Sequence, residues 1–300
     1  MPSARTLLFI ALVAIGVVFL VRWIQQVRGS RQGTAEVRPS IFESAVGFVT
    51  NFFDTLGIGS FAPTTSIYKL KNMVSDEHIP GTMHIGHTPP VIIQAFIFIA
   101  IIQIDMTTLV TMITAAVLGA WLGAGVVARL PRRRIQVGMG IALLVAATSF
   151  VMSIYGFFPG GGTDLGMRGL SLAFAATGSF VLGSLMTIGV GFYAPCMIMV
   201  SLLGMNPTTA FPIMMGSSAF LMPVASLRFL RAKKYSLRPA IGLALGGIPA
   251  VLIAAFIVKS LPLNAMRWLV VAVVLYAAVA MLRSAYREGQ TSKICGEISG

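Results

Sequence analysis

The residues that could do chemistry are few, and Asp54 is the acidic one that lies beside a helix-breaking element. Asn51 precedes it by about one helical turn. A carboxylate inside a membrane is costly to bury and usually functional. The alternative is that Asp54 lies at a water-exposed hairpin tip or caps a helix. As a functional group it would bind a coupling ion, H⁺ or Na⁺, with Asn51 beside it, because a carboxylate repels an anionic substrate.

All three histidines of the chain, His78, His84 and His87, fall within ten residues. His84 and His87 are three residues apart, so they would share one face of a helix. No standard motif supplies a further zinc ligand, and a metal site is not predicted. Two interpretations remain for this pair, a cavity-lining proton or anion group and a packed or interfacial histidine. His78 follows two acidic residues in a loop and is expected to be solvated.

A repeated motif, T-x-G-x-G-x-x-A-P, occurs as Thr55–Pro63 and again 132 residues later as Thr187–Pro195. Glycine and proline break helices and so free backbone donors and acceptors. At membrane depth this is tolerated only against protein or a water-filled cavity. Helix ends at such breaks can present N–H groups to an anion. We therefore expect a small solute to bind between the two elements.

Gly86-His87-Thr88 aligns with Gly216-Ser217-Ser218, if a slip of three residues is allowed after the preceding prolines. Hydroxyl and imidazole groups at related positions suit oxyanion recognition. Individually, Ser and Thr in membrane helices more often bond their own backbone, and the glycines could serve only close helix packing. The predicted substrate-binding residues are Thr55, Gly57, Gly59, Ser60, His84, His87, Thr88, Thr187, Gly189, Gly191, Tyr193, Ser217 and Ser218.

The composition places these residues in a lipid bilayer. Of 300 residues, 56% are hydrophobic and 10% charged, with a mean hydropathy of +0.88, whereas soluble domains carry about 25% charged residues. The net charge of +13 would suggest nucleic acid for a soluble protein, but here Lys and Arg occupy short loops between apolar runs. No nucleic-acid partner and no cofactor are predicted. Cys196 and Cys295 give neither a disulfide framework nor metal-ligand spacing.

The loop charges predict which side each loop faces. If the apolar runs alternate in direction, 18 of the 22 lysines and arginines fall on one side, which is then the cytoplasm. The basic segments on that side are Arg22–Arg38, Lys69–Lys71, Arg129–Arg134, Arg228–Arg238 and Arg283–Lys293. A multi-pass protein of the cell membrane is expected.

The repeat also predicts the architecture. Leu130-Pro131 recurs as Leu261-Pro262, and these equivalent positions fall on opposite sides of the membrane. We therefore expect an all-α polytopic membrane protein of two inverted repeats with broken or re-entrant helices. The first apolar run, 7–21, could be a signal peptide, but the arginines after it favour a retained N-terminal anchor helix. The predicted divisions are an anchor and basic loop (1–40), a first repeat (41–158), a second repeat (168–286) and a cytoplasmic tail (287–300).

At Gly57–Pro63 and Gly189–Pro195 the chain resembles the TauE/SafE family of sulfite exporters and sulfonate-uptake permeases. That family carries a glycine-rich element ending in proline in each half, here thinned to Gly-x-Gly. The basic segment Arg228–Tyr235 and the small-residue run Leu118–Pro131 add to the resemblance, which covers roughly residues 44–282. It implies a transporter of small anions, often sulfur oxyanions or organosulfonates.

The sequence therefore predicts a secondary transporter that moves a small anion by alternating access, and not an enzyme. An anion channel is an alternative, because inverted repeats serve both functions. A membrane-embedded enzyme is a weaker one, since only Asp54 with His84 and His87 approaches a catalytic set. The expected partners are the anion, the bilayer and a coupling ion, and a homo-oligomer is left open.

Overall fold

The computed structural model describes residues 3–29, 38–157, 162–189 and 191–257, with single positions between 275 and 287. In this part of the chain the fold is all helix, with one isolated β-bridge between Asp164 and Met205. The helices are α1 (Ala4–Gly29), α3 (Ile41–Thr55), α4 (Phe61–Lys71), α5 (Ile79–Ile101), α6 (Met106–Val127), α7 (Arg132–Ile154), α8 (Gly169–Met186), α9 (Tyr193–Leu202), the short 3₁₀ turn η1 (Pro207–Thr209), α10 (Ala210–Ala232) and α11 (Leu237–Ile257).

Six of these helices are long and apolar enough to cross a bilayer. They are α1, α5, α6, α8, α11 and the continuous helical segment formed by η1 and α10. The prediction of an all-α, multi-pass membrane protein is thus confirmed. The last helix of the second repeat and the tail beyond it lie almost wholly outside the described residues.

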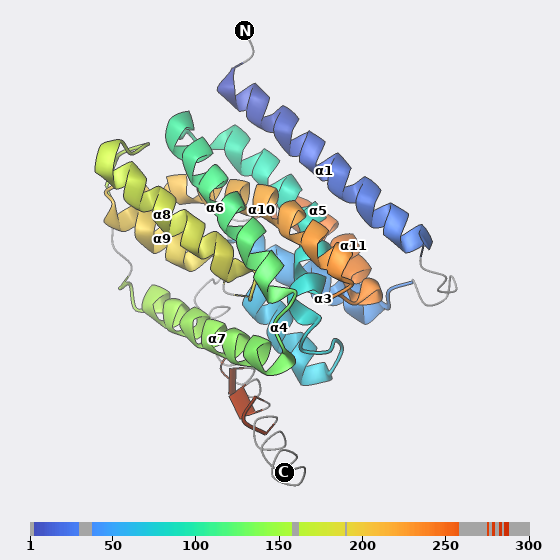
Figure 1. Ribbon diagram of the computed structural model, residues 1–300. Helices are drawn as coiled ribbons and strands as arrows, with labels where there is room; N and C mark the ends of the chain where they lie inside the picture. Colours follow the sequence, from blue (N-terminus) through green and yellow to red (C-terminus); the bar gives the residue numbers. More distant parts are fainter. Residues whose placement is uncertain are drawn as a thin grey trace.

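The helix packing repeats between the two halves. At the centre α5 crosses α10, α6 packs against α10, and α11 packs in the same way against α5. Outside this core α8 lies along α6, and α3 lies along α11 (Figure 1). Suppose that α3, α4, α5 and α6 correspond in order to α8, α9, α10 and α11. The contact of α6 with α10 then corresponds to that of α11 with α5, and the contact of α3 with α11 corresponds to that of α8 with α6. This is the pattern expected of two related halves, whose exact limits stay a prediction.

Small residues bring the outer helices close to their partners. On α6 and α8, a Cβ on Gly119 would collide with the backbone oxygen of Phe180. On α3 and α11, a Cβ on Gly47 would lie 2.6 Å from the Cα of Leu243. Both contacts leave no room for a side chain, so these glycines set the helix separation that holds the broken elements in place.

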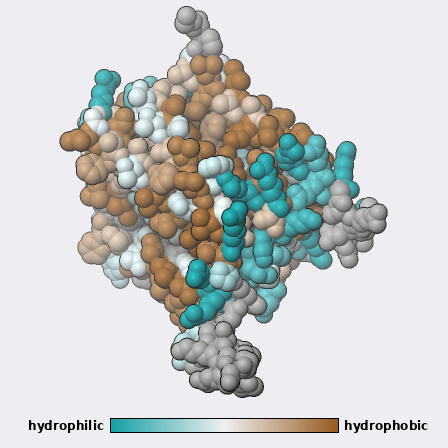
Figure 2. Space-filling view, in the orientation of Figure 1, coloured by the Kyte–Doolittle hydropathy of each residue, from teal (hydrophilic) through white to brown (hydrophobic). Residues whose placement is uncertain are grey.

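The basic loops gather at one end of the molecule. The polar contacts that join them are Gln26 Nε2 to the Leu230 carbonyl (2.8 Å), Arg238 Nε to Glu43 Oε2 (3.0 Å), Gln136 Nε2 to Asp76 Oδ2 (2.9 Å) and Lys234 Nζ to Glu77 Oε2 (3.5 Å). Figure 2 shows hydrophilic residues collected at the right of the view, with a mostly hydrophobic surface beside them. We refer to this region as the basic end.

The opposite end is held by backbone contacts between the remaining loops. Asp105 N–H donates to Leu165 (2.8 Å), Gly162 N–H to Met205 (3.0 Å), and Asn206 N–H to the carbonyl of residue 164 (2.8 Å). The described loops therefore sort into the two sets that the charges predict. Which set faces the cytoplasm stays a prediction of the charge distribution.

Helix α1 lies on the outside of the bundle, against α10 and α5 (Figure 1). Leu12 and Phe19 on its inner face are fully buried, and Trp23 is 7% exposed. Its outer face carries apolar side chains such as Ile10 and Val17, each more than half exposed. An exposed apolar face of this kind is suited to contact lipid.

Candidate functional site

Each glycine element forms a tight loop that ends one helix and begins a shorter one. Gly57 (φ +81°) and Gly59 (φ +87°) lie between α3 and α4, and Gly189 (φ +104°) follows α8. Residues with a side chain rarely adopt these positive φ values, so the turn itself requires glycine. The helices that follow, α4 with 11 residues and α9 with 10, measure about 15–17 Å at 1.5 Å per residue. That is about half of a bilayer core of ~30 Å.

Each loop is covered by the long helix of the other half. A Cβ on Gly57 would lie 3.3 Å from the ring of Phe211 on α10, and one on Gly189 would lie 3.4 Å from Met139 on α7 and 3.7 Å from Met83 on α5. The second glycine of each pair differs, because a Cβ on Gly59 or Gly191 would meet no atom within 4 Å. One glycine of each pair is therefore closed by packing, and the other borders open space.

A buried polar cluster joins the first glycine element to the second. We call it the Asp54 cluster, and its members are Asp54, Thr55, Gln94 and Tyr193. The Tyr193 hydroxyl lies 3.0 Å from Asp54 Oδ2 and 3.3 Å from Gln94 Oε1, so it can donate to either oxygen. Gln94 Nε2 donates to the Thr55 hydroxyl at 2.9 Å. All four side chains are at most 4% exposed.

The charge of Asp54 has no counter-ion in this cluster. None of the described salt bridges includes Asp54, and its nearest polar groups are neutral: Tyr193, Gln94 and Ser60. An isolated buried carboxylate is strongly unfavourable unless a proton or cation neutralises it. Whether Asp54 binds a coupling ion or simply carries a proton stays a prediction.

His87 belongs to a second buried group next to the Asp54 cluster. Its Nδ1 lies 3.1 Å from Asn51 Oδ1, and its Nε2 lies 3.1 Å from the Thr64 hydroxyl. The amide of Asn51 also donates to the Gly47 carbonyl at 2.7 Å. The Thr55 hydroxyl donates to the Asn51 carbonyl at 2.9 Å and so connects the two groups. Both ring nitrogens of His87 therefore have partners within the protein.

Two hydroxyls on α10 complete the polar region. Ser217 and Ser218 are fully buried, and neither hydroxyl makes a well-formed hydrogen bond among the described residues. The Ser218 side chain neighbours the Tyr193 hydroxyl. An unpaired buried hydroxyl costs about 1–3 kcal/mol, so two adjacent ones are well suited to a ligand that accepts hydrogen bonds.

Other residues predicted for the site make contacts away from the Asp54 cluster. The Thr187 hydroxyl donates to the Ser184 carbonyl at 2.6 Å, on the side of α8 that faces α6. The Thr88 hydroxyl donates to the carbonyl of its own helix at residue 84, at 2.6 Å. His84 Nδ1 bonds the Pro80 carbonyl at 2.9 Å, and its ring packs against Phe61 and Phe229. Its Nε2 is buried and has no partner in the part of the chain that the structure describes. Whether these side chains bind substrate stays a prediction.

The site also contains residues that the sequence analysis did not select. Gln94 lies in an apolar stretch of α5 and connects Thr55 with Tyr193, and Thr64 supports His87. A lone glutamine inside an apolar run was the available signal for Gln94, because an amide placed there needs a buried partner. Nothing in the spacing of Thr64 distinguishes it from its neighbour Thr65.

Comparisons with known proteins agree with this architecture. The family model described as "Sulfite exporter TauE/SafE" matches residues 2–150 and 170–297, so the match includes α1, which the resemblance noted above leaves out. No curated protein and no solved structure matches the chain. Since the family model covers most of the chain and both glycine elements, this protein belongs to the TauE/SafE family of sulfite exporters.

Proposed function

We propose that this protein is a secondary transporter that carries a small anion, a sulfur oxyanion or an organosulfonate, by alternating access. The observation that carries the proposal is the pair of fully buried hydroxyls of Ser217 and Ser218 on α10, of which Ser217 has no partner among the described residues and Ser218 neighbours only the Tyr193 hydroxyl. Sulfur oxyanions present several oxygen acceptors, which hydroxyl donors recognise directly. Family membership supports the same class of solute.

The position of the Asp54 cluster supports a role in transport rather than a purely structural one. It joins the two broken elements, which are the parts of an inverted-repeat transporter that line the binding site. Gly59 and Gly191, one from each element, border open space. A solute bound between them would contact both halves, and a rocking motion of one half against the other would expose it to alternate sides.

Asp54 provides a physical basis for coupling. A charged carboxylate near the serines would repel an anion, and in water-poor surroundings this repulsion is strong. Binding of H⁺ or Na⁺ at Asp54 removes it, so the cation and the anion bind more favourably together than separately. The hydrogen bond from Tyr193 to Asp54 places the coupling group next to the proposed anion donors.

A ligand-stabilisation experiment tests the proposal. Purified protein is heated with sulfite, sulfate, thiosulfate or organosulfonates, with chloride at equal ionic strength as the reference. A ligand at 100 times its Kd should stabilise the fold by about 2.7 kcal/mol. We expect one of these anions to raise the melting temperature of the wild-type protein, and the double variant Ser217→Ala/Ser218→Ala to lose most of this shift.

Ser179→Ala is the matched control, because the Ser179 hydroxyl on α8 is also fully buried and unpaired. It should keep the ligand-induced shift of the wild type. If the double variant responds to the anion as strongly as Ser179→Ala does, these serines do not bind the substrate and the proposed site is wrong.

A further inference from the structure

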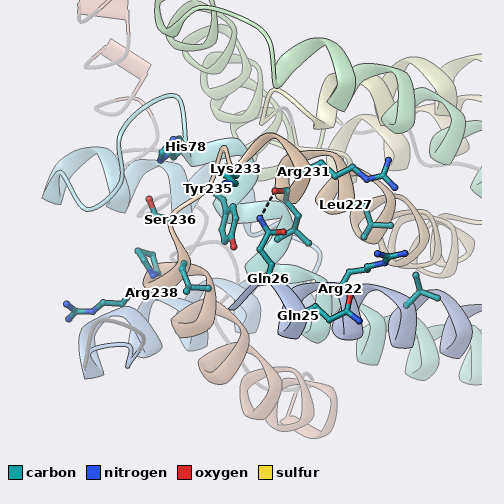
Figure 3. A pocket seen from close by; sticks show the side chains of 14 residues that line it. Arg22, Gln25, Gln26, His78, Leu227, Arg231, Lys233, Tyr235, Ser236 and Arg238 are labelled. Atoms are coloured by element: carbon teal, nitrogen blue, oxygen red, sulfur yellow. Dashed lines mark hydrogen bonds between the residues drawn. The ribbon is translucent and has the colours of Figure 1, made fainter. Parts of the chain in front are cut away.

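A second polar feature lies at the basic end, outside the Asp54 cluster. It is a cavity of about 970 Å³ between α1, the end of α10 and the start of α11 (Figure 3). We call it the α1–α10 pocket. No member of the Asp54 cluster lines it. Gln26 and Leu230 both line it, and the Gln26 side chain donates to the Leu230 carbonyl at 2.8 Å. This hydrogen bond joins α1 to α10.

The cations of this pocket divide into paired and unpaired ones. Arg238 is held by Glu43, with 3.0 Å between Nε and Oε2. Arg22, Arg231 and Lys233 are exposed and have no acidic partner among the residues that the structure describes. Figure 3 shows Arg22 and Arg231 extending toward the same side, with Leu227 between them. The pocket therefore offers an excess of positive charge to an anion.

One part of the lining is apolar and continues onto the outer face of α1. Val18, Leu227 and Leu230 contribute to the wall. Val18 is 51% exposed and belongs to the row of apolar side chains on the lipid-facing surface of α1. Arg22 follows it by one helical turn on the same face. The pocket thus lies at the level where the membrane-embedded surface changes from apolar to basic, which is the depth of the lipid phosphates.

We propose that the α1–α10 pocket binds an anionic phospholipid. Its phosphate lies between Arg22 and Arg231, and its acyl chains run along Val18 and Leu227. A free inorganic anion would use the cations but leave the apolar wall without a partner, whereas a phospholipid satisfies both parts. Basic pockets between membrane helices on the cytoplasmic side favour such lipids. The bound lipid would fasten α1 to α10.

Native mass spectrometry of the purified full chain in detergent tests this inference, with phosphatidylglycerol or cardiolipin added and phosphatidylcholine as the zwitterionic reference. We expect both anionic lipids to bind at least about 10-fold more tightly than phosphatidylcholine. The double variant Arg22→Gln/Arg231→Gln should lose that preference. Arg5→Gln/Arg28→Gln removes the same charge from α1 outside the pocket and should keep it.

Three results would overturn the proposal. The first is equal lipid binding by the two double variants, and the second is no preference over phosphatidylcholine. The third is displacement of the lipid by millimolar inorganic phosphate, which would identify a site for a soluble anion. If the double variant does not purify as a folded protein, Arg231→Gln and Arg28→Gln provide the same comparison as single changes.

Discussion

Replacing Gly59 by valine distinguishes a binding role of the glycine elements from a packing role. The φ of Gly59 is +87°, so a Cβ there costs left-handed strain of about 1–2 kcal/mol. No atom lies within 4 Å of that Cβ, so strain is the main expected loss of stability. For a chain of this size the melting temperature should fall by about 2–8 °C. Because the new side chain enters the open space that the solute is proposed to occupy, anion affinity should fall at least about 10-fold, or ~1.4 kcal/mol.

Two other glycines provide matched controls. Gly156 has a φ of +72° and no atom within 4 Å of its Cβ, but it lies in the loop after α7. Gly156→Val should therefore lose similar stability and keep wild-type affinity. Gly57→Val should lose more stability than Gly59→Val, since its Cβ lies 3.3 Å from the Phe211 ring. Affinity and melting temperature are measured for each purified variant in one detergent. Normal affinity in a destabilised Gly59→Val would show that this glycine only permits the turn and does not border the binding site.

Three further predictions concern coupling, orientation and the basic end. Asp54→Asn keeps an acceptor for the Tyr193 hydroxyl but cannot take up a proton, so gradient-driven accumulation should vanish while the protein stays folded; unchanged accumulation in vesicles would refute coupling at this residue. In a variant lacking the native cysteines, Thr163→Cys, at an exposed position of the same loop, should react with an impermeant maleimide on intact cells; reaction of Arg133→Cys from outside would contradict the predicted topology. Lys69→Met leaves Asp76, which is 3% exposed, without the ammonium group 2.8 Å away. Unfolding free energy should fall by about 3 kcal/mol, and an unchanged melting temperature would exclude a structural role for this pair.

Two features could be predicted, namely which loops lie at the same end of the bundle and the internal repeat. Both depend on local features of the sequence. Loop charge distinguishes the two ends of the bundle, and the recurrence of Thr55–Pro63 as Thr187–Pro195 marks the two helix breaks. Positive φ at Gly57, Gly59 and Gly189 explains why glycine stands there. These properties depend on short stretches of sequence, so they do not require knowledge of how the helices pack.

The partners within the site could not be predicted in the same way, because they depend on helix packing. Thr55 and Thr187 occupy the same motif position, yet Thr55 meets Gln94, whereas Thr187 bonds within α8. The repeat makes these threonines equivalent in sequence, but the halves differ in the side chains that face them. Similarly, Phe61 stands where the second element has Tyr193, so the hydroxyl that reaches Asp54 comes from one half alone.

Transport by purified protein in sealed vesicles tests the central claim most directly. Uptake of the sulfur oxyanion or organosulfonate that gives the largest thermal shift is followed with and without a pH or Na⁺ gradient. We predict saturable uptake that the gradient drives above equilibrium, and loss of that uptake in Ser217→Ala/Ser218→Ala. No uptake of any anion in the panel above that of protein-free vesicles would contradict the account. A flux that rises linearly with concentration and never accumulates would identify a channel instead.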